Sequence, residues 1–280
     1  MLPFPPGNGV FSSFSFLVLG TGIASDVRRA PLAVKSSPSG ASCVYLPLLR
    51  TCLLLIFGSV LFSANSTAQS SLFNIPTADT LSKGERYVEI DFDAHFGKYR
   101  DGGWQSYGGM GIYGLNNRTE IGLNAYATRF AGGFGSIEIQ PNFKFKAYEN
   151  ERLGLTVSGG AIGYIPLKGG RLRDSQVSAY AVATKSFSSD WAPRLTGGAY
   201  ELLGRDRGEA RRGLMFGIEQ PIHKRITLIG DWNTAKNRFG YAAAGVGVTL
   251  TKRSYLYSAY YFGNEGRANN SFGIYYGYSF

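Results

Sequence analysis

Residues 271–280 read Ser-Phe-Gly-Ile-Tyr-Tyr-Gly-Tyr-Ser-Phe. Every second side chain of this stretch is large and apolar, and those between are small or polar, with Tyr275 as the exception in size. Successive side chains of a β-strand point to opposite faces, so this period of two predicts a strand with one apolar face. That face carries Phe272 and then Ile274, Tyr276, Tyr278 and Phe280.

A strand of this kind, ending on an aromatic residue, resembles the closing strand of bacterial outer-membrane β-barrels. In those proteins the segment is the signal that the barrel assembly machinery reads. The resemblance implies this role for Ile274, Tyr276, Tyr278 and Phe280. An edge strand of a soluble β-protein would show the same local pattern, with its apolar face turned to a core.

The same alternation recurs through residues 84–280 and favours the barrel. The 38 glycines and the 14% aromatic content also suit an all-β architecture. We therefore predict a transmembrane antiparallel up-and-down β-barrel of about twelve strands. The predicted strands are residues 86–96, 104–114, 119–129, 136–147, 153–167, 175–187, 194–203, 214–222, 226–234, 239–250, 255–263 and 271–280.

The connections between these strands alternate in length, as they do in outer-membrane barrels. Short periplasmic turns are predicted at residues 115–118, 148–152, 188–193, 223–225 and 251–254. Outer loops, most of them longer, are predicted at residues 97–103, 130–135, 168–174, 204–213, 235–238 and 264–270. Facing directions are ambiguous in the seventh, tenth and eleventh strands. Pro141 predicts a bulge or other irregularity in the fourth, because proline cannot donate a ladder hydrogen bond.

Residues 50–68 have the pattern of a signal peptide. Arg50 precedes an apolar run at 52–62, and small residues follow up to Ala68, after which we predict cleavage. The run is shorter than the roughly 20 residues of a membrane-spanning helix, which leaves a retained anchor as the alternative. Residues 1–49 are expected to be a mis-assigned or disordered leader.

Composition narrows the function further. Both cysteines precede residue 69, so the expected mature chain forms no disulfide. The formal net charge is +10, but the basic residues are scattered and form no basic helix or base-stacking motif, so we expect no nucleic-acid partner. We expect the outer membrane as the location, with its lipids and the assembly machinery as partners.

Residues 69–83 are predicted to be a periplasmic lead-in. The run Asn-Ile-Pro-Thr-Ala at 74–78, followed by a Leu-x-Lys-Gly turn, resembles the opening of many exported barrel proteins, a likeness that carries no known activity. We expect no plug domain, because the strands already use the residues that follow.

Charged side chains on the polar faces of the strands are candidates for lining the lumen. They are Glu89, Asp91, Asp93, His95, Glu138, Lys144, Lys146 and Asp231. Inward tyrosines are expected at Tyr87, Tyr107, Tyr126, Tyr164 and Tyr180. Residues two apart on a strand are spaced by roughly 6 to 7 Å, too far for the three carboxylates near His95 to chelate one ion alone. We therefore predict no metal site and no cofactor.

The outer loops carry a basic rim, which is either solvated charge or a surface that attracts anionic solutes or lipid phosphates. Its residues are Lys168, Arg171, Arg173, Arg205, Arg207, Arg211 and Arg212.

For the function we predict a narrow passive channel for small polar or charged solutes. One alternative is a structural or adhesive barrel whose own side chains fill the lumen. The other is an outer-membrane lipid hydrolase using His95 and Ser106, but the His-x-Ser-Asn-Gly stretch of such enzymes is absent from the sequence. We therefore predict no catalytic residue.

Overall fold

The computed structural model of the chain describes residues 70–204 and 208–280. The predicted leader, the signal peptide with its cleavage site at Ala68, and the rim residues Arg205 and Arg207 lie outside the described residues. No helix among the described residues is both long enough and apolar enough to span a membrane.

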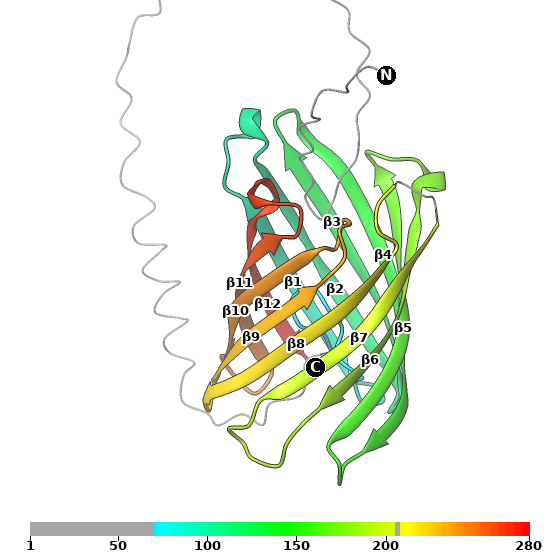
Figure 1. Ribbon diagram of the computed structural model, residues 1–280, viewed down its shortest axis with the longest axis vertical. Helices are drawn as coiled ribbons and strands as arrows, with labels where there is room; N and C mark the ends of the chain where they lie inside the picture. Colours follow the sequence, from blue (N-terminus) through cyan, green and yellow to red (C-terminus); the bar gives the residue numbers. More distant parts are fainter. Residues whose placement is uncertain (1–69, 205–207) are drawn as a thin grey trace, which may run out of the picture. The chain divides into compact units, whose positions relative to one another are not determined.

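The described chain forms a closed barrel of twelve antiparallel strands, each paired with its neighbours in sequence (Figure 1). The strands are β1 (Arg86–His95), β2 (Trp104–Asn116), β3 (Thr119–Phe130), β4 (Gly133–Asn150), β5 (Leu155–Lys168), β6 (Gln176–Lys185), β7 (Arg194–Gly204), β8 (Arg212–His223), β9 (Ile226–Asn233), β10 (Tyr241–Thr249), β11 (Ser254–Gly263) and β12 (Ser271–Ser279). Short 3-10 helices lie in three loops: η1 (Tyr99–Asp101), η2 (Leu172–Asp174) and η3 (Arg267–Asn269).

Closure depends on the pairing of β1 with β12. Their register runs from Tyr87 opposite Ser279 to Ala94 opposite Phe272. The backbone N–H of Phe280 extends this ladder by donating to the carbonyl of Arg86 (2.8 Å). A barrel closed in this way has no free sheet edge, so its backbone groups are satisfied without water.

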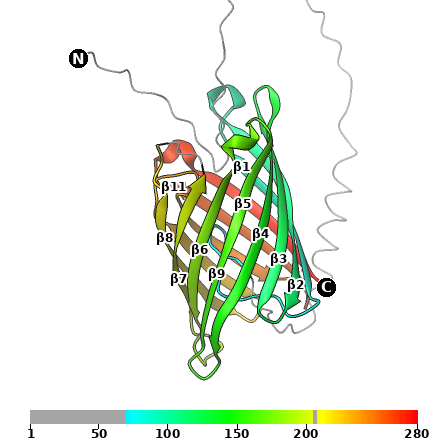
Figure 2. The ribbon, with the colours of Figure 1, turned by 90° about the vertical axis from the view of Figure 1, so that its right-hand side faces the viewer.

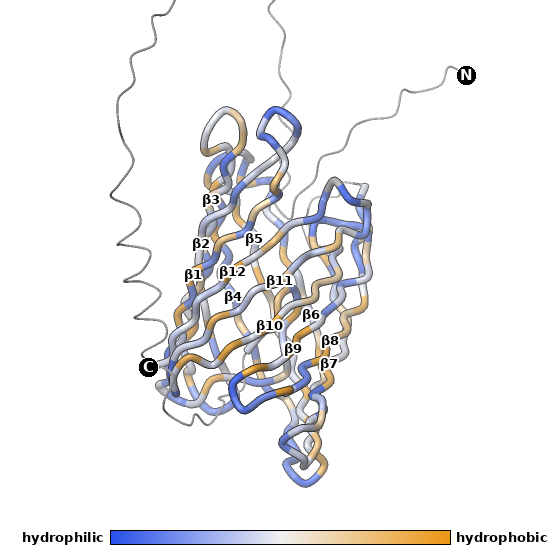
Figure 3. The backbone as a smooth tube through the Cα atoms, turned by 90° about the vertical axis from the view of Figure 1, so that its left-hand side faces the viewer, coloured by the Kyte–Doolittle hydropathy of each residue, from blue (hydrophilic) through white to orange (hydrophobic). Residues whose placement is uncertain are grey.

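The outer surface of the barrel is apolar and the connecting loops are polar. Ile90 is 70% exposed and Leu123 53% exposed, although both lie in the middle of strands. Figure 3 shows hydrophilic residues gathered in the loops at both ends, with hydrophobic residues along the strands between them. The side chains of Ile274 and Tyr276 on β12, and of Phe280 directly after it, are likewise exposed, as the period of two predicts.

The twelve predicted strands are confirmed, and their ends differ from the predicted ends by no more than three residues. One detail differs. The register of β4 against β5 shifts at Ile137/Glu138 and at Lys146/Tyr148, and it stays constant across Pro141, where we expected the irregularity. Pro141 is exposed on the outer face, and on its other side it pairs in register with Leu123 of β3.

Candidate functional site in the barrel lumen

The segment that precedes β1 lies inside the barrel. Residues 70–81, called here the hairpin segment, turn back on themselves through hydrogen bonds from Leu72 N to Ile75 O (2.8 Å) and from Thr77 N to Ser70 O (3.1 Å). Four of its apolar side chains, Leu72, Ile75, Ala78 and Leu81, are at least nine-tenths buried, and Phe73 is partly buried. Drawn in cyan, the segment lies within the ring of strands in both ribbon views (Figures 1 and 2). The segment predicted as a lead-in therefore lies inside the barrel, where it occupies part of the lumen.

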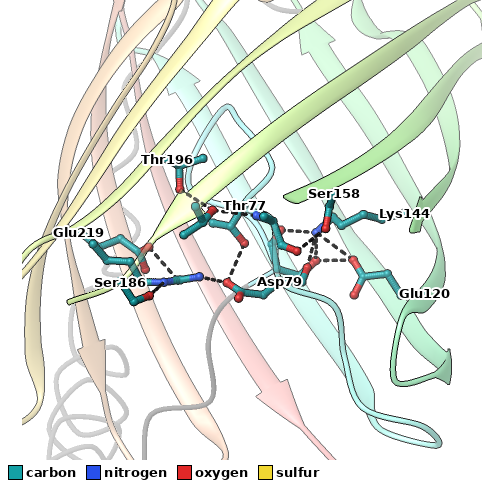
Figure 4. A network of polar contacts seen from close by, with 12 residues as sticks. Thr77, Asp79, Glu120, Lys144, Ser158, Ser186, Thr196 and Glu219 are labelled. Atoms are coloured by element: carbon teal, nitrogen blue, oxygen red, sulfur yellow. Dashed lines mark hydrogen bonds and ion pairs between the residues drawn. The ribbon is translucent and has the colours of Figure 1, made fainter. Parts of the chain in front are cut away.

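Lys144 of β4 holds the start and the end of the hairpin segment together (Figure 4). Its ammonium donates to the backbone carbonyl of Ser70 (2.6 Å), to the hydroxyl of Ser70 (2.7 Å) and to the carbonyl of Asp79 (2.9 Å). It also pairs with Glu120 of β3 at 3.0 Å, and both side chains are about 95% buried or more. Glu120 accepts a further hydrogen bond from the backbone N–H of Leu81 (2.8 Å). A buried ammonium needs such partners, because burying it unpaired would cost several kcal/mol.

A second group of wall residues, on β5 to β8, holds Ala78 and Asp79 near the end of the hairpin segment. Arg194 of β7 pairs with Asp79 and, at 2.9 Å, with Glu219 of β8 (Figure 4). Thr184 of β6 accepts a hydrogen bond from the backbone N–H of Ala78 (2.9 Å). The hydroxyl of Ser158 on β5 donates to the carbonyl of Ala78.

The tip of the hairpin segment docks on β8 and β9. Asp231 of β9 accepts hydrogen bonds from the backbone N–H of Asn74 (2.7 Å) and from its side-chain amide (2.8 Å). Leu72 occupies the space that a side chain on Gly217 would need, because a Cβ built there would lie 2.3 Å from the Leu72 Cδ1 atom. The glycine of β8 thus provides room for the apolar tip.

A loop from the opposite end of the barrel narrows the lumen at a second level. Residues 234–240, called here the constriction loop, connect β9 to β10. Arg238 of this loop reaches Glu138 of β4 and donates to both carboxylate oxygens (2.8 and 3.0 Å). Phe239 packs on Tyr164, with ring centroids 4.7 Å apart, and meets Tyr200 edge to face at 6.4 Å. The loop is therefore fixed to the inside of the wall.

Between the hairpin segment and the constriction loop lies a cavity of about 170 Å³. Three carboxylates of β1, those of Glu89, Asp91 and Asp93, face it. Tyrosine hydroxyls donate to each of them: Tyr87 to Glu89, Tyr126 to Asp91 (2.7 Å) and Tyr275 to Asp93. No lysine or arginine is among the described residues that line the cavity. The lining of this cavity is therefore acidic and aromatic.

The other predicted lumen residues have local roles. His95 lies near the outer end of β1, where its Nδ1 atom contacts the carbonyl of Asn270. Lys146 pairs with Glu149 at 2.8 Å close to the other rim. Ser106, the conceivable hydrolase serine, accepts a hydrogen bond from Thr128 (3.2 Å). Of the tyrosines expected inside, Tyr107 instead points outward and is 41% exposed, because it stands on the same face of β2 as the lipid-facing Tyr113 and Leu115.

The basic rim residues that the structure describes are exposed. Arg212 makes a surface ion pair with Glu201 (3.0 Å), and Arg211 donates to the carbonyl of Leu202 (3.1 Å). Lys168 ends β5, while Arg171 and Arg173 lie in the following loop. Within residues 70–204 and 208–280, no group of three or more His, Cys, Asp and Glu side chains is placed to hold a metal ion.

Several residues of the lumen were not predicted from the sequence. They are Glu120, Arg194, Glu219, Arg238, Phe239 and the hairpin segment itself. One signal for the hairpin segment was present: its buried apolar residues recur at every third position, 72, 75, 78 and 81, a spacing that fits neither a strand nor an ordinary loop.

The closed barrel, its apolar outer surface and its polar ends define the class of protein: a β-barrel of the bacterial outer membrane. Its fold is similar to that of the KdgM porin, with a TM-score of 0.52 at 10% sequence identity, over 69% of this chain and 99% of that one. The COG4313 outer membrane channel from Pseudomonas putida F1 aligns with a TM-score of 0.46 at 13% identity, over 72% and 98% of the two chains. Outer membrane phospholipase A from Escherichia coli aligns with a TM-score of 0.41 at 13% identity, over 70% and 92%. No protein-family model and no curated protein matches the sequence.

Proposed function

We propose that the protein is an outer-membrane channel for small polar solutes, which the hairpin segment closes in the conformation described. The observation that carries the proposal is the chemistry of the contacts between the hairpin segment and the barrel wall. The polar contacts that hold the hairpin segment come from ionic and hydroxyl groups of the wall, those of Glu120, Lys144, Ser158, Thr184, Arg194 and Asp231. Water can satisfy all of these groups when the segment leaves.

A permanently filled barrel would not need such a wall. Replacing a buried ion pair by apolar residues of similar volume is often neutral or stabilising, so buried pairs are weak devices for stability alone. A charged wall is useful where it becomes wet, and a barrel of twelve strands is wider than the eight-stranded barrels that side chains just fill. We infer that the charged wall serves an open state.

The second candidate is a structural barrel with a filled lumen. It is favoured by the narrowing of the lumen at two levels, by the buried hairpin segment and by the constriction loop. In that case the hairpin segment would be a fixed part of the core, and its loss would destabilise the barrel without creating a conducting path.

Single-channel recording in planar bilayers separates the two candidates. The full barrel protein is compared with a variant in which residues 70–81 are replaced by a glycine-serine linker of equal length. We expect rare or small events from the first and frequent discrete steps from the second, with ion preference changed by adding Lys144→Glu. Both proteins must first show the heat-dependent gel migration of a closed barrel. A folded but silent linker variant would refute the channel and leave the structural barrel. Lipid hydrolysis lost on His95→Ala would instead favour the enzyme.

A further inference from the structure

We propose that the cavity above the hairpin segment is a binding site for a small organic cation, a molecule with one ammonium or guanidinium group and a compact apolar body. The further claim that such cations are the solutes of the channel rests on the proposed function. Binding itself requires only the conformation described.

The first argument is a buried carboxyl oxygen without a hydrogen-bond donor. Asp91 is 4% exposed, and no described residue donates a hydrogen bond to its Oδ1 atom, whereas Oδ2 accepts one from Tyr126. The carboxyl groups of Glu89 and Asp91 also lie within hydrogen-bonding reach of each other. Two ionised carboxylates have no hydrogen to share, so something positive must lie beside them, either a proton or a bound cation.

The second argument is the composition of the walls. The cavity holds three carboxylates and no described basic side chain, while the nearest inward cations are already used: Arg238 by Glu138, and Lys144 by Glu120 and the hairpin segment. The rings of Tyr257, Tyr261 and Phe73 also line it. Aromatic faces attract cations within about 6 Å, most strongly where water is excluded.

The third argument selects an organic cation over a metal ion. A chelated metal needs several ligands around one point, and the described residues offer no such group. The carboxylates are instead strung along β1 at alternate positions. The cavity of about 170 Å³ is slightly larger than the roughly 150 Å³ cavity that accepts benzene. A ring with a one-carbon ammonium arm therefore fits its volume, with the ammonium near Asp91.

The test uses three probes of nearly equal shape on the full barrel protein in detergent micelles, with titration calorimetry as the readout. Benzylammonium carries the charge, benzyl alcohol is its neutral analogue, and benzoate carries the opposite charge. We expect saturable binding of benzylammonium that is at least about tenfold tighter than that of the alcohol, the size expected for one charge-assisted hydrogen bond. We expect no binding of benzoate.

Asp91→Asn should weaken benzylammonium binding by about tenfold or more, since it removes the charge and keeps the shape. Asp101→Asn is the matched control, because Asp101 is an exposed acid of the outer loop in η1. If Asp91→Asn does not fold, Asp93→Asn takes its place, and the comparison of probes on the unchanged protein needs no variant.

Equal binding of alcohol and ammonium, or equal weakening by Asp101→Asn, would overturn the proposal. So would absence of benzylammonium binding, which would leave a shared proton between Glu89 and Asp91, or stronger binding of Mg²⁺ or Ca²⁺. None of these results depends on conduction. A barrel that binds benzylammonium, but whose linker variant is folded and silent in the bilayer, would therefore refute the channel and retain the site.

Discussion

Replacing Lys144 by methionine should release the hairpin segment from the wall while the barrel stays closed. The lysine makes three hydrogen bonds to the hairpin segment, at 2.6, 2.7 and 2.9 Å, and one ion pair to Glu120 at 3.0 Å. Methionine keeps most of the volume and none of these contacts. The strand ladders of β4 use backbone groups, so the substitution leaves them intact.

The free-energy cost of the substitution follows from the carboxylate of Glu120, which stays buried after its partner is removed. Breaking a buried ion pair by removing one partner costs about 3 to 5 kcal/mol, because the other charge is left buried. Glu120 keeps its hydrogen bonds from Ser70 and Leu81, which favours the lower end of this range. The charge regains water when the hairpin segment undocks, so the cost falls on the docked state. A shift of about 3 kcal/mol changes the docking equilibrium roughly 100-fold, since each 1.4 kcal/mol is a factor of ten.

Amide hydrogen exchange measured by mass spectrometry reports this equilibrium. Peptides that cover residues 70–81 should lose about 100-fold of their protection in Lys144→Met, while peptides from β1 and β12 should keep theirs. Lys146→Met is the matched control, because Lys146 is the next inward lysine on the same strand and pairs with the half-exposed Glu149. Unchanged exchange in Lys144→Met, or the same loss of protection in both variants, would refute the reasoning.

Three further results are expected. Gly217→Leu should displace the hairpin tip and mimic Lys144→Met in hydrogen exchange, because the new side chain takes the space of Leu72. Gly111→Leu is the control and should have no such effect, since nothing lies within 4 Å of the Cβ position of Gly111. Removing Phe280 should lower the yield of heat-modifiable barrel in cells. Phe262→Ala should not lower it, although Phe262 is also an exposed aromatic residue of the outer face (48% exposed). Equal yields from the two variants would contradict the role of the terminal residue. Amino-terminal sequencing of the membrane-extracted protein should begin at Gln69, and a different first residue would disprove the predicted cleavage.

The strands were predictable because the rule that creates them is local. In a barrel wall, alternate side chains of a strand face lipid and lumen, so they must differ in polarity or size. On β1 and β12 this difference is strong enough to be recognised in a single strand. Where small residues and tyrosines occupy both faces, as on β11, the sequence left the facing direction ambiguous. There the structure turns Tyr255, Tyr257 and Tyr261 inward.

The partners of the inward charges were not predictable, because they depend on the stagger between strands and on segments far away in sequence. The sequence predicts that Lys144 faces the lumen, six residues after Glu138 on the same strand, but it indicates no partner for either side chain. The register of β3 against β4 instead places Glu120 directly opposite Lys144. Glu138 pairs with Arg238, a hundred residues later, through a loop whose path no local pattern indicates.

The hairpin segment escaped prediction for a related reason. A peptide of twelve residues has no core of its own, so its conformation exists only because the lumen supplies partners for its backbone. Four apolar residues at every third position indicate burial, but the pattern does not say which residues they pack against. The burial is possible only because polar groups of the closed wall lie where they can pair with the backbone of the segment.

The hairpin segment and the acidic cavity are linked, because residues 71–74 form part of the cavity lining. A cation bound there contacts the docked state more completely than an undocked one, so by linkage it stabilises the docked hairpin segment, and the hairpin segment in turn strengthens cation binding. The carboxylates of Glu89, Asp91 and Asp93 belong to β1 of the wall and not to the hairpin segment. The same three groups would therefore act in two ways: in the closed barrel they help to retain a cation beneath the constriction loop, and in the open barrel they attract cations into the lumen. Retention of a cation favours the docked hairpin segment, and attraction of cations favours their flow through the open barrel. One solute would therefore influence both the closing of the channel and its ion selectivity.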